Sequence, residues 1–241
     1  MLCSVNSQLE PQNFIDKVDF TKNDPCLFVT YPAGAAGDLL ISIIDKHYLR
    51  TGCEYYGIEN TGKIKLYTTD YEMIDLSLTK NKYLFDDQWF WNLAEQLGKR
   101  TLNYSLLDQV IFGSHLWQNF QLENILDTFP NAKIINIRPK DSYGAKLIEF
   151  LKRFKLYNLD DKDLALLSDN LEIIPFEHER VYTLPFGTLF NEKSYDIYYK
   201  QIIDFLSLEG RLISFDYIKY YLSKQHPKIK NLLIDYSQQY V

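Results

Sequence analysis

The chain has 241 residues and a formal net charge of −6, and 46% of its residues are hydrophobic. This length and apolar content allow one large domain with a sizeable core. The acidic balance argues against a nucleic-acid-binding protein, because neutralising phosphates with Lys and Arg drives that kind of binding. We therefore expect no nucleic-acid partner.

Cysteine and histidine usage indicates neither a disulfide framework nor a metal site. The three cysteines are odd in number and none forms a C-x-x-C spacing, and the four histidines lie far apart. The first residues carry no signal-peptide core, and no apolar run approaches the length of a membrane span. We expect one cytoplasmic domain over residues 1–241, with a polar N-terminal arm at 1–24 and a helical tail at 211–241.

The first predicted element is a buried strand at 26–31, a short apolar run bounded by prolines. A turn rich in small residues follows at 32–37, and apolar residues recur with helical period from Asp38 onward. Short strands are expected within 63–69. The later elements expected are, in chain order, a helix at 86–99, a strand at 108–113, a helix at 122–129, a strand at 132–138, a helix at 141–155, strands at 171–176 and 180–185, and helices at 194–206 and 215–224. This alternation predicts an α/β domain with a mostly parallel, doubly wound sheet, whose ligands bind at the carboxyl ends of the strands.

The turn after the first strand is the first candidate site, and it comprises Gly34, Ala35, Ala36, Gly37 and Asp38. The unpaired backbone N–H groups at a helix N-terminus, together with the helix dipole, suit a phosphate or sulfate. The turn lacks the Lys-Ser/Thr of the nucleoside-triphosphate P-loop and is not G-x-G-x-x-G. The alternative interpretation is an ordinary tight turn in which Asp38 caps the helix.

Two further candidates follow later strands. His115 closes the strand that ends at Ser114, where an imidazole can take a proton from a hydroxyl; the alternative is a histidine that hydrogen-bonds a loop. Arg138 ends another strand and offers forked donors to a phosphate, unless it pairs with Asp141. Ser142 either caps the next helix or adds a hydroxyl to the same phosphate. The basic residues further along that helix are expected on a solvated face; they are Lys146, Lys152, Arg153 and Lys155.

The order of these segments resembles the sulfotransferase family over about residues 26–210. Tyr31-Pro32 with the small-residue turn and Leu39-Leu40 resembles the family's 5′-phosphosulfate loop. The segment 112–116, Phe-Gly-Ser-His-Leu, resembles the strand that ends in its catalytic His-Leu. Residues 131–141 resemble its 3′-phosphate strand, and residues 183–190 followed by 202–206 resemble its late strand, turn and helix.

This resemblance implies a three-layer P-loop-like fold with a central mostly parallel sheet. It also implies transfer of a sulfuryl group from 3′-phosphoadenosine-5′-phosphosulfate to a hydroxyl of a small molecule or glycan, without a metal. The turn Gly34–Asp38 would then hold the 5′ phosphosulfate, and His115 would be the base. Arg138 and Ser142 would hold the 3′-phosphate.

The turn departs from the family pattern. The family carries Lys or Arg and then Ser/Thr in its loop, whereas this chain has only Ala and Gly at 33–37, and Asp38 adds a negative charge. Because sulfuryl transfer requires cations on the donor's oxygens, a second hypothesis is a catalytically silent protein of this fold with a binding or structural role in an assembly. A third, a kinase-like enzyme, is disfavoured by the missing Lys-Ser/Thr. A cation folding over the turn would favour the transferase; the candidates are Lys46, Lys63 and Lys65.

Overall fold

The computed structural model describes residues 23, 25–50, 55–59, 64–66, 109–157, 167, 173–208 and 214–240. The predicted N-terminal arm lies outside these residues except for Asn23, and the helix predicted at 86–99 lies outside them entirely. The sections below concern the described residues.

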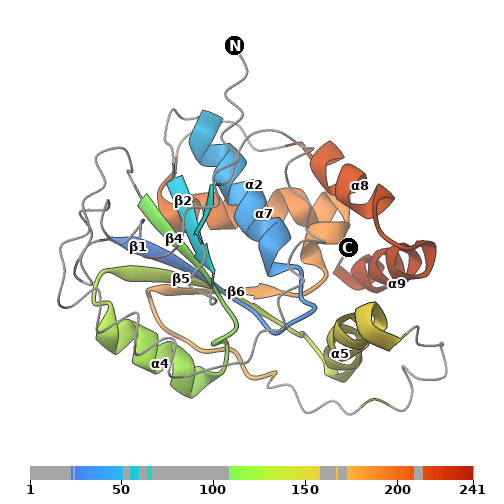
Figure 1. The fold of residues 1–241 in the computed structure, drawn as a ribbon, viewed down its shortest axis with the longest axis horizontal. Helices are drawn as coiled ribbons and strands as arrows, with labels where there is room; N and C mark the ends of the chain where they lie inside the picture. The colour runs from blue at the N-terminus through green and yellow to red at the C-terminus, as the bar shows by residue number, and fades with distance from the viewer. Residues whose placement is uncertain are drawn as a thin grey trace.

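Six strands form one sheet in the order β3-β2-β4-β1-β5-β6 (Figure 1). All neighbouring pairs from β2 to β6 are parallel, and only the edge strand β3 runs antiparallel to its neighbour β2. The strands are β1 (Cys26–Thr30), β2 (Tyr55–Glu59), β3 (Ile64–Leu66), β4 (Gln109–Ser114), β5 (Ala132–Arg138) and β6 (Val181–Pro185). The mostly parallel sheet expected from the sequence is confirmed.

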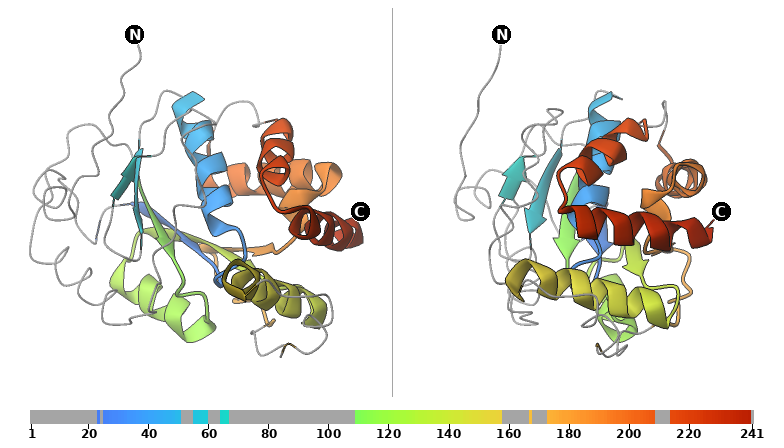
Figure 2. Two further views of the ribbon diagram at one scale, coloured as in Figure 1. Left: turned by 45° about the vertical axis from the view of Figure 1, so that its right-hand side comes forward. Right: turned by 90° about the vertical axis from the view of Figure 1, so that its right-hand side faces the viewer.

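Helices cover both faces of this sheet. Figures 1 and 2 show α4 on one side of the sheet, and α2 with α7 on the other. The helices and 3₁₀ turns are α2 (Gly37–Arg50), α4 (Asn119–Thr128), α5 (Ser142–Tyr157), η2 (Thr188–Phe190), α7 (Glu192–Leu206), α8 (Asp216–Ser223), α9 (Pro227–Ser237) and η3 (Gln238–Tyr240). A central parallel strand followed by a turn and a helix, within three layers, is the P-loop-like arrangement that was predicted.

The alternation of side chains along the strands builds a different core on each face. Leu27 and Val29 of β1 and Ile135 and Ile137 of β5 belong to the large apolar cluster that includes α2 and α7. The intervening residues face α4, as the contact between the Phe28 and Phe129 rings at 5.1 Å indicates. Because side chains alternate with period two, consecutive residues at a strand end point to opposite faces.

Two expectations from the sequence need revision. Residues 173–176 form no strand, so the strand predicted at 171–176 is wrong for these residues. Pro175 cannot donate a ladder hydrogen bond, and the carbonyl of Ile174 is used by an arginine side chain instead. The strand β2 was not predicted, although it pairs with β4 and carries the antiparallel β3 at the sheet edge.

Candidate functional site

The turn between β1 and α2 has a backbone that only small residues adopt readily. Gly34 has φ +100° and Ala36 has φ +56°, so two nearby residues are left-handed. A left-handed alanine costs about 1–2 kcal/mol, so the turn holds backbone strain at Ala36. The N–H of Ala35 donates to the carbonyl of Pro32 at 3.0 Å and tightens the turn. The turn expected from the sequence is therefore present, directly before the N-terminus of α2.

Close packing holds this turn against the middle of α5. A Cβ atom on Gly34 would lie 2.5 Å from the carbonyl oxygen of Ile148 and 3.0 Å from the backbone nitrogen of Lys152. Gly34 is thus required both by its φ angle and by the approach of α5. The contact also brings Lys152 to the turn, far from it in sequence.

Tyr31 and Asp38 occupy the mouth of the turn. The Tyr31 ring lies against the Cα of Gly37, where any Cβ would overlap it. Its hydroxyl donates to Oδ1 of Asp38 at 2.7 Å. Asp38 lies in the first turn of α2, where a carboxylate interacts favourably with the helix dipole. The chain's own carboxylate therefore already supplies negative charge beside the position predicted for an external anion.

His115 lies directly beside Tyr31. The two rings meet edge to face with centroids 4.8 Å apart, and the His115 Nδ1–H donates to the Tyr31 carbonyl at 2.9 Å. Because a carbonyl only accepts, Nδ1 carries the hydrogen and Nε2 carries the basic lone pair. Burial lowers the pKa of His115 below its ordinary value; the Tyr31 hydrogen bond and the Asp38 charge oppose this shift, and the Lys152 charge adds to it. The imidazole is therefore neutral at pH 7, as a general base must be.

Lys152 is the cation that the turn itself lacks. A Cβ atom on Gly34 would lie 3.4 Å from the Lys152 Cβ, so this side chain starts beside the turn, and its charge adds to the lowering of the His115 pKa. The ammonium pairs with Glu149 at 3.5 Å and is 48% exposed. The sequence pattern predicted Lys152 on a solvated helix face, which is right for its exposure but misses its position. The side chains of Lys46, Lys63 and Lys65 lie outside the described part of the chain.

Arg138 lies at the same sheet edge, but its guanidinium is directed to the other face. The side chain is 1% exposed. It donates to the carbonyls of Ile174 and Trp117, the latter at 2.9 Å, and to Oδ1 of Asn119 at 2.5 Å. Asn136, two residues earlier on β5, also donates to the Trp117 carbonyl, at 3.3 Å, as period-two alternation requires. At least three of the five guanidinium N–H groups thus donate to acceptors in the described part of the chain.

Asp141, rather than Ser142, caps α5. Oδ1 of Asp141 accepts from the backbone N–H of Gly144 at 2.7 Å and from the Tyr236 hydroxyl at 3.4 Å. Ser142 is the first residue of α5 and is exposed. The structure therefore places His115 and Lys152 beside the turn, whereas Arg138 ends the neighbouring strand β5 and Ser142 begins α5.

Comparisons with known proteins place the chain at a distance from all of them. No family model matches, and no curated protein sequence matches. Among solved structures, a sulfotransferase from Alicyclobacillus acidocaldarius is 11% identical, with 90% of this chain and 92% of that chain covered and a TM-score of 0.40. The sulfotransferase domain from the curacin biosynthetic pathway is 14% identical, with coverage of 86% and 80% and a TM-score of 0.35.

A gluconokinase from Sinorhizobium meliloti 1021 is also similar, at 13% identity, with 67% of this chain and 82% of that chain covered and a TM-score of 0.38. The similarity is distant. Because each TM-score is below 0.5, none of the three carries weight in assigning an activity. Membership of the sulfotransferase family stays a prediction.

The described residues contain neither a metal-binding cluster nor a membrane-spanning helix. No group of three or more His, Cys, Asp or Glu side chains in that part of the chain is arranged to hold a metal ion. Within the same residues, no helix combines the length and apolarity that crossing a bilayer requires.

Proposed function

We propose that this protein is a sulfotransferase-like enzyme that uses 3′-phosphoadenosine-5′-phosphosulfate and a hydroxyl acceptor. The observation that carries the proposal is the position of His115. A neutral imidazole, with its basic nitrogen set by the Tyr31 carbonyl, lies beside a turn whose N–H groups suit a sulfate or phosphate. In this proposal Nε2 accepts the proton of the hydroxyl.

The residues fit the two ends of that donor unequally. The left-handed turn, the N-terminus of α2 and the nearby Lys152 charge provide donors and a cation for the 5′ phosphosulfate. Arg138 offers less to the 3′-phosphate, because it is buried and donates to three protein acceptors. Binding there through Arg138 and Ser142 stays a prediction that requires Arg138 to exchange protein acceptors for phosphate oxygens.

Lys152 has a defined role in this proposal. We propose that its ammonium reduces the repulsion that a bound anion meets at the turn, because Lys152 packs against Gly34. Since Lys152 is about half exposed and shares Glu149, its contribution is screened. We expect Lys152→Gln to weaken anion binding by about two- to fivefold, which corresponds to roughly 0.4–1 kcal/mol.

Calorimetric titration with adenosine 3′,5′-bisphosphate tests the proposal. Arg153→Gln is the matched control, since Arg153 also pairs with Glu149, at 2.8 Å, but does not act on His115. The transferase proposal requires the bisphosphate to bind, Lys152→Gln to weaken it, and Arg153→Gln to leave it unchanged. It also requires His115→Ala to keep bisphosphate binding while lowering turnover by roughly 10²–10⁴.

A second candidate, a catalytically silent protein of the same fold, is favoured by the hydrogen bond between Tyr31 and Asp38. That pair fills the mouth of the turn with the chain's own ring and carboxylate. This candidate predicts no bisphosphate binding even at millimolar concentration, and it predicts that substitutions of His115 and Arg138 act only through stability.

A further inference from the structure

A groove of about 560 Å³ lies between the start of α7, the helix α8 and the helix α9. Its apolar lining comes from Phe190 of η2, Phe215 and Leu222 at the start and end of α8, and Ile234 of α9. This volume falls within the range that holds small organic ligands, about 300–1,000 Å³. None of the residues of the turn, nor His115, lines it.

Two aromatic rings in the lining limit which ligand shapes fit the groove. Phe190 is almost fully buried and stacks on Tyr221, with ring centroids 6.2 Å apart. Phe215 packs against Tyr195 at 5.4 Å, and the Lys219 ammonium lies 5.5 Å from the centroid of the Phe215 ring, so both lining rings are held in place. Rings fixed in this way favour a flat apolar ligand over a flexible chain, because aromatic pairs gain from offset or edge contacts.

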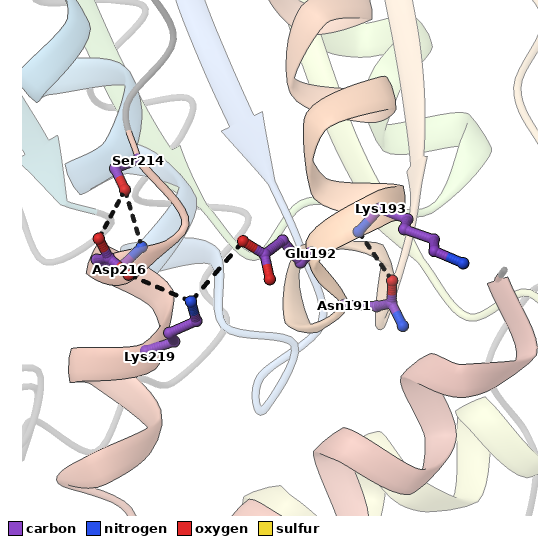
Figure 3. Close-up of polar contacts among 6 residues, drawn as sticks. All are labelled: Asn191, Glu192, Lys193, Ser214, Asp216 and Lys219. Atoms are coloured by element: carbon purple, nitrogen blue, oxygen red, sulfur yellow. Dashed lines mark hydrogen bonds and ion pairs between the residues drawn. The ribbon is translucent and has the colours of Figure 1, made fainter.

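Three lysines from three helices also line the groove: Lys193 of α7, Lys219 of α8 and Lys230 of α9. Figure 3 shows the Lys219 ammonium between Asp216 and Glu192, and these pairs measure 3.2 Å and 3.7 Å. Lys219 is therefore largely neutralised locally.

Lys193 and Lys230 differ from Lys219. Within the described residues neither forms an ion pair, and both are exposed. Figure 3 shows Lys193 extending on the opposite side of Asn191 from Glu192 and Lys219. On a chain with a net charge of −6, this groove is a locally cationic site with an apolar floor.

We propose that the groove binds a small organic anion: a flat apolar body that lies against Phe215 and Ile234, carrying a sulfonate, sulfate, phosphate or carboxylate that meets Lys193 and Lys230. Anion and floor are both required, because exposed lysines alone contribute little and are screened by salt. The proposal is independent of the nucleotide turn.

Calorimetric titration of the full chain with naphthalene-2-sulfonate at low ionic strength tests this site. The comparison ligands are 2-naphthol, which has the same ring system without the charge, and inorganic sulfate, which has the charge without the ring. We expect the sulfonate to bind about five- to tenfold more tightly than 2-naphthol, and inorganic sulfate to bind more weakly still. Equal binding of 2-naphthol and the sulfonate would overturn the role of the lysines.

Substitutions locate the binding. Lys193→Gln and Lys230→Gln should each weaken the sulfonate by about two- to fivefold, and Lys193→Glu combined with Lys230→Glu should remove measurable binding. Lys200→Gln is the control, because Lys200 is an exposed lysine of α7 outside the groove. Adenosine bisphosphate binding should be the same in all four variants. If Lys200→Gln weakens the sulfonate as much as the groove variants do, binding is a general charge effect and the site is refuted.

Discussion

Replacing Asp38 by asparagine separates the stabilising role of this residue from its effect on ligands. The substitution keeps the shape of the side chain but removes a charge in the first turn of α2 and weakens the hydrogen bond from the Tyr31 hydroxyl. Loss of the charge–dipole interaction costs about 0.3–1 kcal/mol, and exchanging a charge-assisted for a neutral hydrogen bond costs about 0.5–1 kcal/mol. We therefore expect the free energy of unfolding to fall by about 1–2 kcal/mol.

The same substitution should strengthen anion binding at the turn. Two unit charges about 7 Å apart, at an effective dielectric constant of about 40, repel by about 1.2 kcal/mol. Removing that repulsion should raise the affinity for adenosine 3′,5′-bisphosphate by about five- to tenfold. The variant is thus expected to be less stable and to bind more tightly, which a general loss of structure cannot produce.

Urea unfolding and calorimetric titration measure the two effects on the same protein. Asp196→Asn is the control, since it makes the same charge change at an exposed position of α7. The control should leave both quantities within experimental error. If Asp38→Asn binds no better than the wild type while the wild type does bind, Asp38 does not face the anion and the proposed position of the donor is wrong.

Three further predictions concern pH, packing and the buried arginine. Because burial lowers the pKa of His115, the free energy of unfolding should fall as pH decreases below about 6.5, by up to ~1.4 kcal/mol per pH unit. The urea midpoint of His115→Gln should lack this pH dependence. Urea midpoints of the wild type and the variant that change in parallel with pH would contradict the prediction. Gly34→Ala should lower the free energy of unfolding by about 2–4 kcal/mol, and Gly37→Ala by about 1–3 kcal/mol. The Gly34 substitution costs more because that residue has a positive φ and its added Cβ would overlap backbone atoms, whereas a Cβ on Gly37 would overlap the Tyr31 side chain. Thermal unfolding that shows the opposite order would count against this packing. Arg138→Met should lower the free energy of unfolding by about 2–4 kcal/mol, since buried carbonyls lose their donor, and a change below 0.5 kcal/mol in urea titrations would refute the buried geometry.

Local patterns were sufficient to predict the strand, turn and helix of the candidate site. A six-residue apolar run between prolines, followed by small residues and a helical period, depends on residues close in sequence, and it matches β1 and α2. The parallel direction of the strands also follows from their alternation with helices. The sequence placed His115 at the carboxyl edge of the sheet, and its position beside Tyr31 follows from the pairing of β1 with β4, which the sequence did not predict.

Lys152 and the acceptors of Arg138 could not be predicted in this way. Lys152 reaches the turn only because α5 packs on Gly34, a tertiary contact with no local signal. For Arg138 a signal was present: Asn136 lies on the same face by period-two alternation, and a polar pair on one face of a central strand indicates shared buried partners. That pattern favours a structural arginine. The only alternative to phosphate binding that we predicted from the sequence was an ion pair with Asp141.

The Tyr31–Asp38 pair explains how a turn without lysine remains stable. The dipole of α2 favours a negative charge at its N-terminus, and Asp38 supplies one. Tyr31 in turn fixes the carboxylate, and its ring makes glycine necessary at position 37. A bound anion must therefore displace favourable interactions that the chain already makes. Whether Lys152 compensates for that loss bears on which of the two proposed functions holds. The affinity of the Lys152 and Asp38 variants for adenosine 3′,5′-bisphosphate therefore distinguishes the two proposals.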